Sequence, residues 1–378
     1  MKRDTLRVWF QVHRWSSLVP TVFLLLLCVT GLPLIFWHEI AHLTGGEPEL
    51  PAVTAARPHS VDHLVASALA ARPDDVPLYV SWEEDEPRIT YVTTGPRADA
   101  SDDEMHVATF DAATGASIPA PQFNEGVMWV LYRLHTDLYA GLPGLLFMGL
   151  MGLLLVVAMV SGVVLYAPFM RKLPFGVLRR GGRRLPWLDW HNLTGIATLA
   201  WLTVVGVTGV INTLEQPIVG LWQQRHVSQV LDEPAGAVAP RRPQASLQAA
   251  IEAAQARHPG NVPSWVAMPG TGFSGRLHYG VMLRGDTPLT ASLIEPVFVN
   301  ATTGEVAGSV EQPAWMQALL LSQPLHFGDY AGLPLKILWA LLDIAAIVVL
   351  VSGLVLWVRR FSPAQLESRI DARMEAAS

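Results

Sequence analysis

Histidines at repeated positions are the residues of this 378-residue chain best suited to chemistry. The segments 135–166 and 326–357 align without a gap, and each opens with a histidine, His135 or His326, shortly before the same YAGLP sequence. Apolar residues exchange freely in a membrane span, so retained polar and small residues indicate chemistry or close packing. The alignment therefore marks the two histidines as candidates for function.

A second, weaker pairing joins His13 to His191, each followed at the same distance by a Thr-Gly dipeptide (residues 30–31 and 208–209). The longer repeat carries a Ser-Gly dipeptide in both copies, at 161–162 and 352–353. Neutral imidazole is a common metal ligand, so the four histidines are candidate ligands. The alternative is that they are interfacial residues, hydrogen-bonded to headgroups or helix ends.

The composition predicts a membrane protein, because 51% of the residues are hydrophobic and only 15% are charged. Four stretches are long enough to span a bilayer as helices. They are Leu18–Trp37, Leu138–Met170, Leu193–Leu214 and Ile337–Val358. The first is too long for a cleaved signal peptide and is expected to remain as an anchor.

Basic residues predict the orientation of the spans. The N-terminus and the connector 171–184 are rich in Lys and Arg, and Arg359-Arg360 follow the last span. The segment 43–125 is strongly acidic. We therefore expect both termini inside and two large loops outside, which in a bacterial inner membrane would be periplasmic.

The expected fold is an α-helical integral membrane protein with two span–loop–span repeats and two periplasmic α+β domains. Each outer segment contains an amphipathic helix, strand-like pieces and a turn with Asp111 or Asn300 four residues before a glycine. The predicted order is 1–42 (first span), 43–125 (outer domain), 126–170 (second span), 171–188 (basic connector), 189–215 (third span), 216–318 (outer domain), 319–360 (fourth span) and 361–378 (cytoplasmic tail). Two such halves would be related by a pseudo-two-fold axis along the membrane normal.

The single cysteine, Cys28, lies within the first span. It excludes a disulfide within the chain, an iron–sulfur cluster and a C-x-x-C-H haem attachment. The basic residues are explained as topology signals, so nucleic acid is not an expected partner.

The order of these motifs resembles the PepSY-associated transmembrane helix family over nearly the whole chain. A membrane-entry histidine with a following Thr-Gly, an ATG-type turn closing each outer domain, and an LH…G…SG…W span carry the resemblance. Members include haem-containing inner-membrane ferric-siderophore reductases, so the resemblance implies a haem-dependent enzyme with PepSY-like outer domains. It also implies two b-type haems whose iron is held by His13 with His191 and by His135 with His326. Small residues along the spans would let the flat macrocycles approach the helices.

The implied reaction is the reduction of Fe(III) in a siderophore or other chelate outside the membrane, which releases Fe(II) for iron uptake. The cofactors would carry the chemistry, so no side chain is expected to act as acid, base or nucleophile. No flavin or nicotinamide fingerprint is present, so electrons would come from a separate cytoplasmic reductase or from quinol. The alternative is a non-enzymatic module whose PepSY-like domains bind or restrain a periplasmic partner.

Other candidate residues lie outside the four histidines. His38 and His42 form an H-E-x-x-H pattern, typical of zinc peptidases, which an amphipathic helix end also explains. They are more plausible as contacts of haem or iron. Asp343 lies within a span, where it could pair with a hydroxyl, serve a proton path or be a tolerated neutral carboxyl. Tyr139 and Tyr330 are expected near the outer docking surface.

The predicted topology can be tested with reporter fusions. Reporters after residues 100 and 280 should be active outside the membrane, and one at residue 180 should be active inside. Cytoplasmic activity of the fusion at residue 100 would contradict the orientation and the assignment of histidines to faces.

Overall fold

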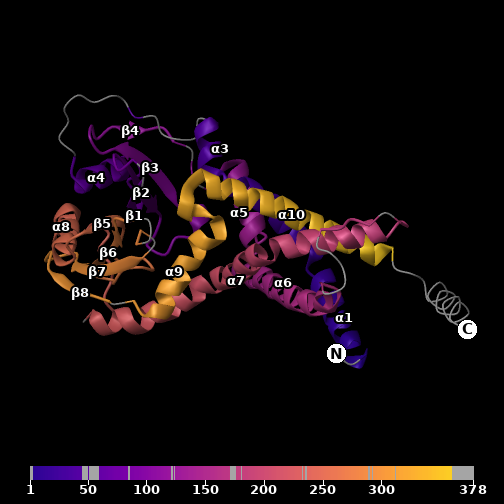
Figure 1. Cartoon of the computed structure of the whole chain (residues 1–378). Helices are drawn as coiled ribbons and strands as arrows, with labels where there is room; N and C mark the ends of the chain where they lie inside the picture. The colour runs from indigo at the N-terminus through magenta and orange to yellow at the C-terminus, as the bar shows by residue number, and fades with distance from the viewer. Residues whose placement is uncertain are drawn as a thin grey trace, which may run out of the picture. The chain divides into compact units, whose positions relative to one another are not determined.

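The structure is a computed structural model that divides into two compact units. The helical unit comprises Met1–Ile35, Arg133–Thr213 and His326–Ser378, and the sheet unit comprises Phe36–Tyr132 and Leu214–Leu325. Figure 1 shows the helices and strands of the whole chain. The residues that the structure describes are 3–44, 50, 59–83, 86–120, 122, 124–170, 176–179, 181–231, 233–234, 236–287, 290–291, 293–310 and 312–359.

The first helices of the helical unit are α1 (Arg3–Leu18) and α2 (Thr21–Ile35), which meet at a bend of 49°. Pro20 lies at the bend, where its missing N–H and its ring prevent an unbroken helix. The sequence predicts one span over Leu18–Trp37, whereas the helix pair begins earlier and is broken. His13 therefore lies on α1, before the bend.

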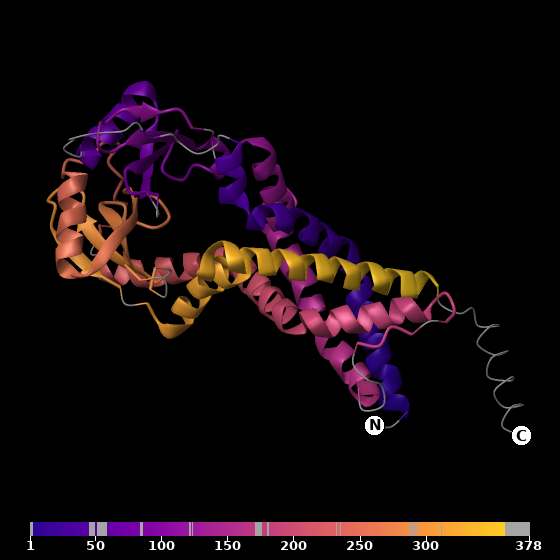
Figure 2. The ribbon, with the colours of Figure 1, turned by 45° about the horizontal axis from the view of Figure 1, so that its top comes forward.

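Three further helices are long and apolar enough to cross a membrane, and the bent α1–α2 pair would make a fourth span among the described residues. They are α6 (Gly141–Met170), the first part of α7 (Leu185–Val230) and α10 (Gly332–Val358). Figure 2 shows α7 and α10 side by side, as their hydrogen bonds require. The chain is thus a membrane protein with a separate sheet domain.

Breaks in the helices change the predicted positions of two histidines. His135 lies at the end of a separate helix, α5 (Gly126–Thr136), and His326 at the end of α9 (Ala314–Phe327). The segment after α5 holds Leu138 and Tyr139 in left-handed backbone conformations. After α9, Gly328 is left-handed (φ 81°) and the short helix η2 (Asp329–Ala331) leads into α10. Left-handed residues cannot continue an α-helix, so each histidine precedes its long span.

Helix α7 also extends beyond its expected end. The sequence predicts an outer segment that begins at residue 216, whereas α7 continues through Pro217 to Val230.

The two outer segments form one eight-stranded antiparallel sheet, in the order β4-β3-β2-β1-β5-β6-β7-β8. The sequence predicts two domains, but the segments pair along β1 and β5, where Val80 lies opposite Val266. Aligning the Val-Pro sequence at 76–77 with the one at 262–263 places Val80 at the position of Val266. Because these two equivalent residues lie opposite each other, an approximate two-fold axis passes between them. The strands are β1 (Val76–Trp82), β2 (Ile89–Gly95), β3 (His106–Asp111), β4 (Ser117–Ile118), β5 (Asn261–Ala267), β6 (His278–Gly285), β7 (Ile294–Asn300) and β8 (Val306–Ser309), with a 3-10 turn η1 (Asp102–Glu104) before β3.

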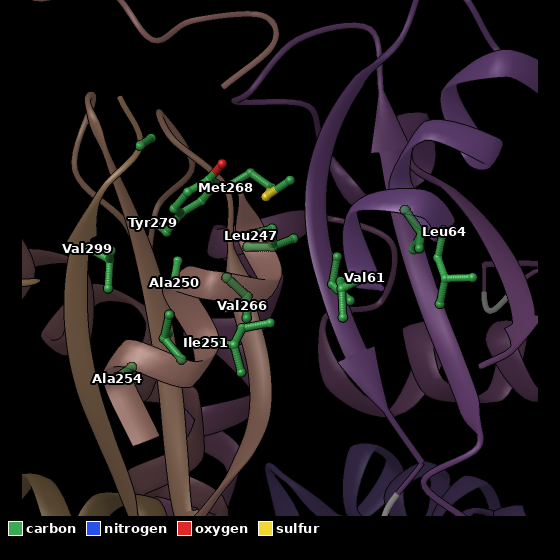
Figure 3. Close-up of a cluster of buried hydrophobic side chains, with 14 of the residues drawn as sticks. Val61, Leu64, Leu247, Ala250, Ile251, Ala254, Val266, Met268, Tyr279 and Val299 are labelled. Carbon is green, nitrogen blue, oxygen red and sulfur yellow. The ribbon is translucent and has the colours of Figure 1, made fainter. Parts of the chain in front are cut away.

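One hydrophobic core joins the halves of the sheet to α4 (Val61–Ala71) and α8 (Leu247–Arg257), the two helices that the sequence pattern predicts there. Figure 3 shows side chains of both helices, including Leu64 and Ile251, against the sheet. The helices also cap one another. The Asp62 carboxylate accepts hydrogen bonds from the N–H groups of Leu247 (2.6 Å) and Gln248 (3.2 Å), and Gln248 Oε1 accepts from Val61 N–H (3.3 Å). Side-chain acceptors at a helix N-terminus stabilise N–H groups that lack partners within the helix.

The two predicted tight turns close each half of the sheet. Asp111 and Asn300 accept hydrogen bonds from nearby main-chain N–H groups, and the glycines four residues later, Gly115 and Gly304, have φ of 71° and 77°. Asp111 is fully buried and also accepts from the guanidinium of Arg88 (2.8 and 3.2 Å). The Arg88 guanidinium holds the pKa of the Asp111 carboxyl below its usual range.

We expect Asp111→Asn to destabilise the sheet by about 1–3 kcal/mol, because Arg88 loses a charged partner beside a buried group. Because the pKa of the Asp111 carboxyl is lower in the folded state, the ion pair contributes fully to the free energy of unfolding above about pH 4. That contribution is lost as the pH falls through the pKa of the folded state. Hydrogen exchange of the β2–β3 amides near neutral and acidic pH measures both effects. Asn300→Asp is the matched control, since an aspartate keeps the turn, and it should change stability by less than about 0.5 kcal/mol. Equal effects of the two substitutions would contradict this role of the ion pair.

Candidate functional site

The helical unit brings His13 of α1 next to His191 of α7, with ring centres 6.4 Å apart and ring planes at 70°. Each ring is held by a different neighbouring helix. His13 Nδ1 lies 2.9 Å from the carbonyl oxygen of Ala158 and 3.2 Å from Ser161 Oγ on α6. His191 Nδ1 lies 3.0 Å from the carbonyl oxygen of Val349 and 3.2 Å from Ser352 Oγ on α10.

The second pair, His135 of α5 and His326 of α9, repeats this arrangement with ring centres 6.3 Å apart and ring planes at 70°. His135 Nδ1 lies 3.0 Å from Thr30 Oγ1 on α2, beside the carbonyl of Leu27. His326 Nδ1 lies 3.0 Å from the carbonyl oxygen of Val205 and 3.2 Å from Thr208 Oγ1 on α7. The structure therefore brings together the two pairs that the sequence predicts.

These contacts determine which ring nitrogen carries the proton. A carbonyl oxygen can only accept, so Nδ1 of each histidine must be the N–H donor. The Ser and Thr hydroxyls donate to carbonyls of their own helices, as Ser161 does to Val157 (2.7 Å) and Thr208 to Val204 (2.7 Å), and so accept from the histidines. In the neutral imidazole the lone pair is then on Nε2, as a metal ligand requires.

Glycines next to these hydroxyl residues let the imidazole rings approach the helices. A Cβ added to any of them would lie 3.0–3.3 Å from a histidine Cε1, closer than ordinary van der Waals contact. The pairs in contact are Gly31 with His135, Gly162 with His13, Gly209 with His326 and Gly353 with His191. The four glycines thus lie directly against histidine rings. Each Ser-Gly or Thr-Gly dipeptide therefore binds a histidine of another helix. The repeated sequence indicates that the dipeptides are important, but it does not identify the histidines that they contact.

The separation of the rings matches that of two imidazoles sharing one metal ion. A metal–nitrogen bond of about 2.0–2.1 Å and about 1.1 Å from nitrogen to ring centre put two opposed ring centres about 6.3 Å apart. The measured values are 6.4 and 6.3 Å. The distance between the ring centres of each pair therefore fits two imidazoles bound to one ion.

The two pairs lie at different levels of the helical unit. His191 and Val205, which contacts His326, are both on α7 and are about 21 Å apart along it at about 1.5 Å per residue. One metal centre cannot use both pairs.

The H-E-x-x-H residues lie in the sheet unit, on the short helix α3 (Trp37–Leu43), where His38 and His42 are exposed. Within the described part of the chain, no group of three or more His, Cys, Asp or Glu side chains could hold a metal ion. The structure thus supplies no third protein ligand for the zinc arrangement among the residues it describes.

The remaining predicted residues belong to the helical unit. Tyr139 is half exposed and lies under the Arg133 guanidinium, 5.1 Å from the ring centre. Tyr330 lies within η2. Asp343 is buried on α10 and pairs with the thiol of Cys28 on α2 rather than with a hydroxyl.

Comparison with known proteins identifies the family of the chain. A family model described as the PepSY-associated TM region matches residues 10–360, which include all four histidines. The chain belongs to this family. An uncharacterized protein of Pseudomonas aeruginosa is 30% identical to this PepSY-associated protein over 251 residues. The match covers 61% of the chain and 63% of that relative, so the chain spans less than two thirds of the relative's length.

The glycine contacts lead to a stability prediction for this PepSY-associated protein. Gly31→Ala should destabilise the helical unit by about 1–3 kcal/mol, because the new methyl group displaces the His135 ring. Gly195→Ala is the matched control: Gly195 is also inside a helix but has nothing within 4 Å of the new Cβ, so the protein should gain about 0.5–1 kcal/mol. Thermal unfolding of the purified protein in detergent measures both. A gain in stability from both substitutions would contradict the proposed packing.

Proposed function

We propose that this protein is a di-haem b-type membrane oxidoreductase. It takes single electrons from a donor at the cytoplasmic face and reduces Fe(III) in a siderophore or other chelate at the outer face. His13 and His191 hold the cytoplasmic-side haem, and His135 and His326 hold the outer-side haem. The coarser conclusion, a membrane protein of the PepSY-associated family, does not depend on this assignment.

The observation that carries the proposal is the presence of two histidine pairs with one geometry at two levels of the helical unit. In both pairs the ring separation fits one ion held by two imidazoles. In both, a main-chain carbonyl or hydroxyl of another helix receives Nδ1–H and leaves the lone pair on Nε2. Interfacial histidines that only bound headgroups would need neither the common ring separation nor an acceptor for Nδ1–H on another helix.

The donor set favours haem over a bare metal ion. Two neutral nitrogens cannot complete a tetrahedral zinc site, whereas a haem supplies four nitrogens and needs only two axial ligands. A haem held by two of these histidines would supply one-electron transfer. The absence of a C-x-x-C-H sequence requires any haem to be bound non-covalently.

The protein's own groups orient the histidines of each site. The acceptors on neighbouring helices fix the tautomer and the direction of each imidazole, as hydrogen bonds behind metal-bound histidines do. The acceptors for His13, His191 and His326 lie on α6, α10 and α7, which are long and apolar enough to cross a membrane. Each turnover moves one electron from the inner to the outer face and converts one Fe(III) to Fe(II). Hydroxamate and catecholate chelators prefer the hard ferric ion, so reduction weakens their hold on the iron.

Absorption spectra of histidine variants test the proposal. His135→Ala or His326→Ala should remove about half of the bound haem and stop reduction of an external ferric chelate, because one axial ligand of the outer site is lost. The remaining haem should still accept electrons from the cytoplasmic side. His13→Ala or His191→Ala should leave the outer haem reducible by dithionite but separated from the cellular donor.

The controls are His38→Ala and His42→Ala, since neither residue is one of the four proposed haem ligands. Both should retain the full haem content. Wild-type protein without a haem absorption band would refute the proposal and favour a non-enzymatic module that binds a periplasmic partner.

A further inference from the structure

Asp343 is a buried carboxyl group without a counterpart in the first half of the chain. Its residue is 6% exposed, and Oδ2 has no hydrogen-bond partner among the atoms that the structure describes. In the repeat alignment Gly152 takes its place. A buried polar atom without a partner costs about 1–3 kcal/mol, so its presence calls for a function.

The side chain that interacts with the Asp343 carboxyl group is the thiol of Cys28 on α2. The pairing of His13 with His191 aligns Cys28 with Gly206. Gly152 and Gly206 face each other between α6 and α7, with a Cβ on Gly152 3.7 Å from the Gly206 carbonyl oxygen. At one of two equivalent interfaces two glycines allow close packing, and at the other the same positions hold a carboxyl and a thiol.

Asp343 lies close to the His135–His326 pair along α2. Cys28 is three residues before Gly31, which places both on one face of the helix within about 4.5 Å of axial rise. Gly31 contacts the His135 ring. The carboxyl group is therefore about one helical turn from the second histidine pair.

No other charge lies in the apolar segments around Asp343. Helices α2 and α6 contain no Asp, Glu, Lys or Arg, and α7 contains none between His191 and Leu214. On α10 itself the nearest charged side chain is Lys336, two turns away, which pairs with Asp329 (3.4 Å). The titratable groups facing this region are thus Cys28 and the histidine pair, and a charge placed on that pair acts on Asp343 with little screening.

We propose that Asp343 is a redox-linked proton acceptor, which rests on the proposed function. Its free oxygen Oδ2 takes up one proton when the His135–His326 site gains an electron from the cytoplasmic-side site, and releases it when the electron passes to Fe(III). The carboxylate charge is then neutralised while the extra negative charge resides at the neighbouring site. Oδ2 has no hydrogen-bond partner among the described atoms, so its protonation breaks no hydrogen bond.

Redox titration of the full-length purified protein, followed by haem absorption at a series of pH values, tests this proposal. The His13→Ala background leaves only the outer centre to be observed. Its midpoint potential should fall by about 59 mV per pH unit over the range in which Asp343 titrates, since one proton accompanies one electron. Asp343→Asn in the same background should remove that slope. An unchanged slope in Asp343→Asn, or no slope in either protein, would overturn the proposal.

Further variants show whether Asp343 itself, and no other carboxylate, accepts the proton. Asp329→Asn, at an exposed carboxylate before α10, should retain the slope. Cys28→Ala removes the side chain beside the carboxyl group, so the pH range over which the potential slopes should shift, which tests the proposal even if Asp343→Asn does not fold. Redox-difference infrared spectra should show a protonated carboxyl band on reduction that is missing in Asp343→Asn. Protein without bound haem would instead refute the proposed function.

Discussion

The hydrogen bond from a histidine Nδ1 to an acceptor on another helix is the interaction on which the helical unit depends. It occurs four times, and each time a glycine beside the acceptor lets the ring reach the helix backbone. Each bond joins two helices far apart in sequence and orients one imidazole. The same contacts thus determine how the helices pack and how the histidines are oriented. A membrane interior offers no water to replace these hydrogen bonds.

Duplication explains why the site is built twice. The same contacts occur within each half of the chain: histidines at the starts of the first and third spans contact Ser-Gly pairs, and histidines before the second and fourth spans contact Thr-Gly pairs. The sheet unit also has approximate two-fold symmetry, with Val80 opposite Val266 and the helices α4 and α8 capping one another. Departures from symmetry, such as Asp343 in place of Gly152, are therefore the informative differences between the halves.

The sequence by itself determined the class of the protein, the approximate spans, the α4 and α8 helices, the two Asx turns and the pairing of histidines. These features follow from local patterns. They are apolar stretches long enough to span a bilayer, apolar residues at helical spacing, turn residues before glycine, and identical motifs at equivalent positions of the repeat. The separation of His135 and His326 from their spans is not predicted, because left-handed residues such as Leu138 and Tyr139 carry no sequence signal.

Only the tertiary structure decided which groups face each other. In the structure the two predicted domains form one sheet. An exposed edge strand can pair with any complementary strand, so the sequence alone does not predict which strand it pairs with. The tertiary structure also assigned Gly31, Gly162, Gly209 and Gly353 to histidine rings, and Cys28 to Asp343. Contacts between helices depend on rotation and crossing of the whole elements, which short-range spacing along one helix does not define.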